Sequence, residues 1–212
     1  MSFVNKLKFV KKQLETGDIY TFYFSLPKNL NHKAGQHGLF ILPGLYRPHP
    51  FTLSSSPDEE FVTVSTHVNT GSRYKQKLMS MKDGDSIFML GPILNFTFDK
   101  LATKYVLLSQ GIGITPFRSM LVHAHAKAMP VTTTLIHVDS NEHAFRQLTE
   151  QYATTAFYPA GVEEFQAQVK AQDIDQLFYI SGSPRFVSAT RELLLKQNVK
   201  AHNIRTDSFL GY

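Results

Sequence analysis

Hydrophobic and polar residues alternate through most of the first half of the chain, a pattern typical of short β-strands. The alternation in residues 6–26 is interrupted at Thr16-Gly17-Asp18, a combination that favours a hairpin turn. Further strand-like runs, separated by glycine and proline, cover residues 35–44, 51–57, 60–68 and 83–98, and a single short helix is expected at 72–81. We therefore expect a β + α/β fold that begins with an antiparallel six-stranded β-barrel over residues 1–100.

The periodicity changes near Asp99 to Thr103, where apolar strands begin to alternate with amphipathic helices. Strands are expected at residues 104–110, 131–140, 154–159, 176–184 and 202–209, and helices at 111–128, 144–153, 162–172 and 185–197. Alternation of this kind predicts a mostly parallel, doubly wound sheet covered by helices. A second domain is therefore expected over residues 101–212.

Two glycine-containing turns lie where a predicted strand leads into a helix of this second domain. In the first, Gly111, Gly113, Ile114, Thr115 and Pro116 follow a buried strand. Glycine lets backbone approach a ligand, and a helix N-terminus favours an anion. Thr115 is expected to cap the helix, with Pro116 at its first position. The alternative, a tight turn that binds nothing, stays open because a lone G-x-G is weak evidence.

The second turn repeats this arrangement with Ser181, Gly182, Ser183 and Pro184, and Ser183 is the expected helix cap. Two such turns at the carboxyl ends of parallel strands predict one nucleotide-binding crevice. Asp139 ends the second strand of this half, where an acid can bond a ribose 2′-hydroxyl and favour NADH. A capping or surface aspartate is an equally good reading of Asp139.

The composition narrows the chemistry that is open to the chain. Its 212 residues include no cysteine, which excludes disulfides, thiolate zinc sites, a cysteine nucleophile and an iron–sulfur cluster held by the chain's own thiolates. The balance of 22 basic and 17 acidic residues gives a net charge of +5. Such a charge suits nucleic acid, a membrane surface or an acidic partner, but scattered solvated lysines give it too.

Several further classes are not expected. The pattern lacks the lysine stripe with interleaved exposed aromatics that nucleic-acid binding requires. The nine histidines include no evident ligand set, so no metal site is predicted. Neither a signal peptide nor an apolar run of about 18 residues is present, so we expect a cytoplasmic protein with no membrane span.

Four motifs occur in a fixed order: "HPFT" from His49, "GIGITPFRSM" from Gly111, "YISGSP" from Tyr179 and "TDSFLGY" from Thr206. Together, over nearly the whole chain, they resemble the ferredoxin–NADP reductase superfamily. That resemblance implies a flavin-binding β-barrel domain followed by an α/β domain that binds NADH or NADPH. It also implies FAD as the cofactor, with FMN less favoured.

The resemblance assigns roles to individual residues. Phe51 would pack on the flavin ring, and Thr52 would offer its hydroxyl to flavin N5. His49 stands where an arginine usually binds the pyrophosphate, and Arg47 could share that load. The remaining expected flavin-binding residues are Pro50, Leu53, Ser54, His67, Gly71 and Ser72. Ser181 would lie beside the nicotinamide, and Tyr212, or else Phe209, would cover the flavin; Thr52, Ser181 and Tyr212 are the expected catalytic residues.

The resemblance implies a flavin-dependent NAD(P)H oxidoreductase. Hydride would pass from nicotinamide to flavin N5, and electrons would then reach a separate acceptor, for which a mildly basic surface suggests an acidic redox protein such as a ferredoxin or flavodoxin. One alternative is a reductase of free flavin, which the loss of arginine at His49 favours. Another, of a different class, is a non-catalytic flavin- or nucleotide-binding regulatory module.

Overall fold

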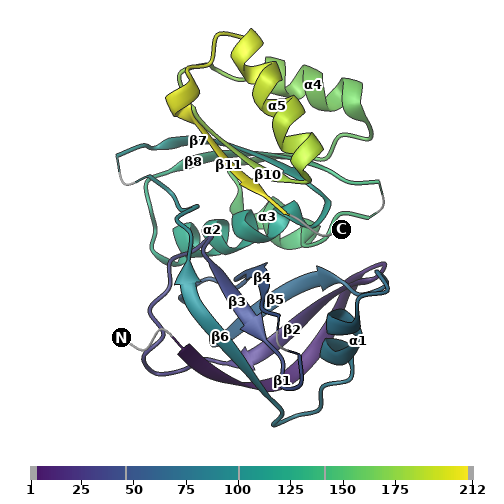
Figure 1. Ribbon diagram of the computed structural model, residues 1–212. Coiled ribbons are helices and arrows are strands. Elements are labelled where there is room, and N and C mark those ends of the chain that lie inside the picture. Colours follow the sequence, from purple (N-terminus) through teal and green to yellow (C-terminus); the bar gives the residue numbers. More distant parts are fainter. Residues whose placement is uncertain (1–3, 46, 100, 141, 210–212) are drawn as a thin grey trace.

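The computed structural model describes residues 4–45, 47–99, 101–140 and 142–209, and within them the chain forms two sheets (Figure 1). The first is antiparallel and six-stranded, in the order β4-β3-β6-β1-β2-β5. Its strands are β1 (Val4–Thr16), β2 (Ile19–Ser25), β3 (His37–Ile41), β4 (His49–Thr52), β5 (Phe61–His67) and β6 (Ser86–Ile93), with helix α1 (Arg73–Met79) between the last two. The predicted hairpin at residues 16–18 is confirmed.

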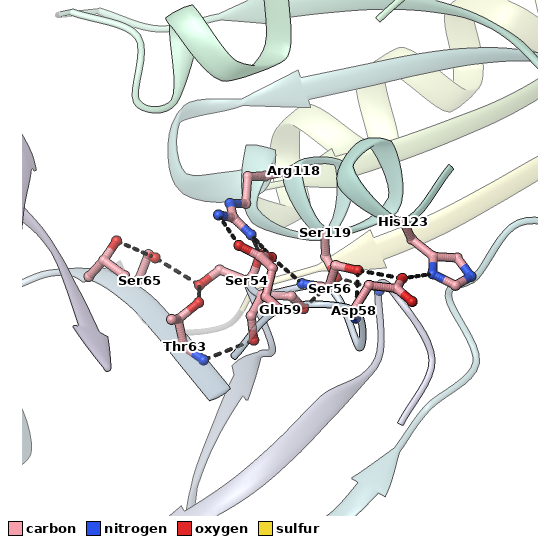
Figure 2. Close-up of polar contacts among 12 residues, drawn as sticks. Ser54, Ser56, Asp58, Glu59, Thr63, Ser65, Arg118, Ser119 and His123 are labelled. Atoms are coloured by element: carbon pink, nitrogen blue, oxygen red, sulfur yellow. Dashed lines mark hydrogen bonds and ion pairs between the residues drawn. The ribbon is translucent and has the colours of Figure 1, made fainter. Parts of the chain in front are cut away.

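Ser54 brings the two ends of this sheet together into a barrel. Its amide donates to the carbonyl of Thr63 on β5 at 2.9 Å. Its hydroxyl exchanges hydrogen bonds with the hydroxyls of Thr63 and Ser65, each at 2.9 Å, as Figure 2 shows. Ser65 in turn pairs with Thr21 at 2.8 Å. This ladder of hydroxyls explains the serine run after β4, because buried polar groups need partners.

The strand at "HPFT" differs from the one expected at residues 51–57: β4 begins at His49 and ends at Thr52. It contains Pro50 because β4 is the last strand of its sheet, and proline is tolerated on a strand that leaves one side unpaired. Pro50 lies opposite Leu39 of β3 in this register.

The second sheet is parallel and five-stranded, in the order β11-β10-β7-β8-β9. Its strands are β7 (Lys104–Gln110), β8 (Thr132–Val138), β9 (Thr155–Phe157), β10 (Leu177–Gly182) and β11 (Ile204–Ser208). Its helices are α2 (Thr115–Ala126), α3 (Arg146–Tyr152), α4 (Val162–Lys170) and α5 (Pro184–Lys196). In Figure 1, α4 and α5 cover the face away from the barrel, and α2 and α3 lie between the two sheets.

Two hydrophobic clusters sandwich the parallel sheet. Val187 and Leu194 of α5 pack with Phe165 of α4 on one face. On the other, Phe117 of α2 packs with Phe96, which follows β6. The first half of the chain thus contributes to the core of the second, and the division predicted at residues 100 and 101 stays a prediction.

A polar seam joins the barrel to α2 (Figure 2). Both guanidinium ends of Arg118 contact the carboxylate of Glu59, and Nη1 also donates to the carbonyl of Ser54 at 3.0 Å. The hydroxyl of Ser119 donates to the carbonyl of Ser55 at 2.6 Å. Asp58 pairs with His123 and Lys127 of the same helical surface. These contacts hold the segment after β4 against α2.

A search of the described residues finds no helix that combines the length and apolar character needed to cross a membrane.

Candidate functional site

A cleft opens where the barrel meets the start of α2. It is lined by His49, Pro50, Phe51, Thr52, Ser65, Thr66, His67, Lys75, Ile112, Thr115 and Phe209. These residues come from β4, β5, α1, the turn before α2, the first residue of α2 and the segment after β11, so both halves of the chain contribute to one site. Thus "HPFT", "GIGITP" and the C-terminal motif, distant in sequence, meet here.

An aromatic wall bounds the cleft on the barrel side. The ring of His49 stacks on Tyr74 with centroids 4.0 Å apart, and Phe51 lies 5.8 Å from Tyr74 and 5.9 Å from Phe40. Phe40 and Tyr74 are buried, whereas Phe51 is partly exposed to the cleft. Burial lowers the pKa of the His49 imidazole, and nearby Lys75 lowers it further. His49 therefore favours its neutral form, unlike the arginine usual at this position.

Thr52 belongs to a buried polar triad that sequence reasoning missed. Its Oγ1 lies 3.0 Å from Nε2 of His37 on β3, and the same nitrogen lies 3.2 Å from Oδ2 of Asp207 on β11. His37 and Asp207 are only 3% and 8% exposed, and the His37 ring packs 6.0 Å from Phe209. A histidine and an aspartate on separate strands thus meet behind the cleft residue Thr52.

Lys75 and the His67–Asp18 pair form another wall of the cleft. Nδ1 of His67 lies 2.6 Å from Oδ1 of Asp18, whose other oxygen accepts from the amide of Asn69 at 3.1 Å. Lys75 is nearly buried on the inner face of α1 with Leu78. Only His67 of these was predicted; the signal for Lys75 is its spacing three residues before an apolar Leu78, which places both on one helix face.

The two glycine turns approach each other closely. An ideal Cβ on Gly113 would lie 2.4 Å from the carbonyl oxygen of Ser181, so only glycine lets these backbones touch. Gly111 has φ +52 and Gly182 φ +158, a region of backbone space that favours glycine. The Ser181 hydroxyl is buried with no hydrogen-bond partner among the described residues. The two turns therefore place backbone at the ends of β7 and β10, and the second turn adds this hydroxyl of Ser181.

The helix starts differ between the two turns. Ser183 caps α5 as predicted, accepting from the amide of Phe186 at 3.3 Å, and its hydroxyl donates to Gln110 at 2.6 Å. The prediction for Thr115 is wrong: Ile114 is the cap and Thr115 the first helical residue. A 3₁₀ turn over Gly111–Ile114 leads straight into α2, so Thr115 bonds the carbonyl of Ile112 at 3.0 Å and Pro116 lies one place further on.

Several predicted residues are not among those that line the cleft. The side chain of Leu53 is fully buried in the barrel core, and Ser54 is committed to closing the barrel. Gly71 and Ser72 precede α1, where Ser72 makes no side-chain cap, and Arg47 is exposed. Asp139 follows β8 with its Oδ2 3.8 Å from an ideal Cβ on Gly111, so it borders the first turn. Tyr212 lies outside the described residues.

His137 forms a hydrogen bond to the first turn, and its titration predicts how the stability of the protein depends on pH. Its Nε2 donates to the carbonyl of Gly111 at 3.0 Å, and its side chain is fully buried. The pKa of His137 is lowered to about 3, mainly by burial and then by the charge of His143. The hydrogen bond to Gly111 raises this pKa, but by less.

Because folding favours neutral His137, its contribution to stability is complete above pH about 6.5 and declines as the pH falls toward 3. We expect the free energy of unfolding to decrease by up to about 1.4 kcal/mol per pH unit from this group. Urea unfolding between pH 7.5 and 4.5 should show a shallower decrease in His137→Gln, which cannot titrate. Equal slopes in both proteins would contradict the assignment.

No protein-family model matches the chain. A curated flavohemoprotein from Bacillus subtilis (strain 168) is 28% identical over 231 residues, covering 94% of this chain and 57% of that protein. The chain thus spans little more than half the length of this relative.

Two solved structures share the architecture over almost the entire chain. The ferredoxin NADP+ reductase from Neisseria gonorrhoeae, with bound FAD and NADP, has a TM-score of 0.83 at 18% identity and covers 100% of both chains. The flavohem-like FAD/NAD binding domain of nitric oxide dioxygenase from Vibrio cholerae O1 biovar El Tor has a TM-score of 0.80 at 22% identity, covering 96% of this chain and 98% of that one. The predicted fold class, a barrel followed by a parallel α/β sheet, is confirmed.

Proposed function

Because the chain has the two-domain fold of the ferredoxin–NADP reductase superfamily, we propose that it is a flavin-dependent NAD(P)H oxidoreductase. One observation carries this proposal: the aromatic wall and the Thr52 hydroxyl share a cleft with the Gly111–Thr115 turn of the other sheet. A hydride donor held by one sheet could there meet an acceptor held by the other. The cofactor is FAD, with FMN less favoured, and the donor is NADH or NADPH.

The cleft residues fit a flavin. Phe51 and His49 offer ring faces for a flat heterocycle, and Thr52 offers a hydroxyl. Outside the cleft lining, Ser181 keeps a buried hydroxyl without a partner among the described residues. A bound flavin would accept hydride from the nicotinamide and release electrons to a second acceptor. The protein's contribution is to position both rings and to exclude water.

The triad behind Thr52 sets the direction of its hydroxyl. A carboxylate of Asp207 only 3.2 Å from Nε2 of His37 favours the tautomer with a hydrogen on that nitrogen. The one hydrogen on Nε2 is donated to Thr52 Oγ1 at 3.0 Å, because Oδ2 of Asp207 receives no hydrogen bond from the described residues and acts through its charge alone. The hydroxyl hydrogen of Thr52 is left to donate into the cleft, which suits an acceptor such as flavin N5. His37 and Asp207 are positioning residues in this scheme.

We assign the nicotinamide nucleotide to the two glycine turns. The backbone of these turns offers N–H groups to its phosphates at the starts of α2 and α5, and Gly113 lets the two turns lie side by side. Asp139 is proposed to bond the ribose, and Ser181 to position the nicotinamide. Phe209, at the cleft edge, and Tyr212 are the proposed covering aromatics that would have to move aside.

The electron acceptor is proposed to be a separate protein. The net charge of +5 supports an acidic partner such as a ferredoxin or flavodoxin. A cytoplasmic location is proposed with it.

Reduction of free flavin is the second candidate, favoured by His49. A mostly neutral imidazole binds a phosphate less strongly than the bidentate guanidinium of arginine, so flavin would be released more readily.

The proposed function predicts that the protein binds flavin and is yellow, and that NADH or NADPH reduces the flavin and removes the colour. Purified protein, supplied with FAD and freed of excess, is expected to show a flavin absorption spectrum, and anaerobic NADH or NADPH should bleach it. Flavin that stays with the protein on a desalting column is a tightly bound cofactor, whereas flavin that is lost behaves as a freely exchanging substrate. Protein that never binds flavin would contradict the proposal, and flavin that neither nucleotide reduces would favour a binding module.

A further inference from the structure

Lys75 places a positive charge in the cleft without a protein anion to neutralise it. Its side chain is 8% exposed and lines the cleft. Across the described residues it forms no ion pair and no side-chain hydrogen bond. Buried charges in folded proteins are normally paired, because desolvation of an isolated charge is costly. The ammonium group of Lys75 is therefore available to an anion that binds in the cleft.

The surrounding charges point the same way. Asp18 influences Lys75 from beyond ion-pair distance, but its carboxylate is committed to His67 and to the amide of Asn69. Burial lowers the pKa of Lys75, and the charge of Asp18 offsets only part of that effect. Lys75 also lowers the pKa of His49, after the larger effect of burial. Lys75 thus adds a positive charge to a cleft in which His49 favours its neutral form.

We propose that Lys75 binds a phosphate group of the flavin nucleotide and supplies the charge that His49 lacks. The proposal deepens, and rests on, the proposed function. The flavin is the favoured source of the phosphate because Lys75 lies on α1, packed against the barrel through Tyr74 and Leu78. The turns assigned to the nicotinamide nucleotide belong instead to the second sheet.

Flavins with and without phosphate test this assignment directly. Dissociation constants of FAD, FMN and riboflavin would be measured by flavin fluorescence for wild type, Lys75→Met and Lys75→Arg. Lys75→Met is expected to raise the dissociation constants of FAD and FMN by about 10- to 100-fold, the usual range for loss of a hydrogen bond to a charged group. Riboflavin should change by less than about threefold, and Lys75→Arg should keep most of the preference for phosphate.

The matched control is Lys82→Met, which removes the same charge at an exposed position just after α1. Folding is checked by the melting temperature without ligand. Lys75→Met should melt at or above wild type, because it removes a desolvated charge and keeps the apolar stem.

The outcomes distinguish a failure of the proposed function from a failure of the assignment of Lys75. If wild type binds none of the three flavins, the proposed function fails. If wild type binds FAD but Lys75→Met keeps the same preference for FAD over riboflavin, the assignment of Lys75 is overturned. Weaker binding of NADH with unchanged binding of FAD would also overturn it, by giving Lys75 to the other nucleotide.

Discussion

Gly113→Ala is expected to lower the free energy of unfolding by about 3 kcal/mol, the upper part of the range for overpacking a well-packed site. The new methyl group would lie 2.4 Å from the carbonyl oxygen of Ser181, 2.7 Å from its carbon and 2.8 Å from Cα of Gly182. All three are backbone atoms of a central strand, so no change of rotamer relieves the contact. The turn before α2 must instead move away from β10.

Movement of this turn should also be visible in function. It would widen the gap between the two glycine turns, so binding of NADH should weaken together with stability. Thermal unfolding should show a melting temperature lower by about 6–12 °C, given about 2–4 °C per kcal/mol for a chain of this size.

Gly161→Ala is the control for Gly113, because an ideal Cβ on Gly161 meets nothing within 4 Å. Gly161 precedes α4, so the loss of a favourable N-cap limits its expected effect to under about 1 kcal/mol. If both variants unfold alike, the close approach of the two turns is not a strong constraint.

Local signals predicted the order of the secondary-structure elements. The hairpin at residues 16–18, the change of period after the barrel and the cap at Ser183 all follow from short-range rules. The error at Thr115 has a local cause as well. Sequence alone did not distinguish a helix that starts after a threonine cap from one entered through a 3₁₀ turn, because both suit a threonine followed by proline.

The rest of the site depends on pairing between distant strands. His37 and Asp207 become partners of Thr52 only because β3, β4 and β11 converge at the cleft, and no motif marks that meeting. Ser54 was assigned to the flavin because it follows "HPFT". Its hydroxyl also helps to close the barrel, a role that depends on the register of β5 and that no motif indicates.

The ion pair between Arg118 and Glu59 provides the second large expected effect. Arg118→Met should cost about 2–3 kcal/mol of unfolding free energy, somewhat less than the 3–5 kcal/mol typical of breaking a fully buried pair. Arg118 is 13% exposed and Glu59 30%, so water can partly compensate the carboxylate that remains. The carbonyl of Ser54 also loses its donor.

A double-mutant cycle with Glu59→Gln isolates the pair. Removing both charges avoids leaving either one unpaired, so Arg118→Met/Glu59→Gln should be more stable than the sum of the single effects implies. The exposed pair Arg146–Glu150, at 56% and 47% exposure, serves as the control, and Arg146→Met should cost under about 0.5 kcal/mol. Additive single effects at Arg118 and Glu59 would mean that the seam contributes little. A clear coupling would instead mean that α2 holds in place the segment after β4, which directly follows Thr52.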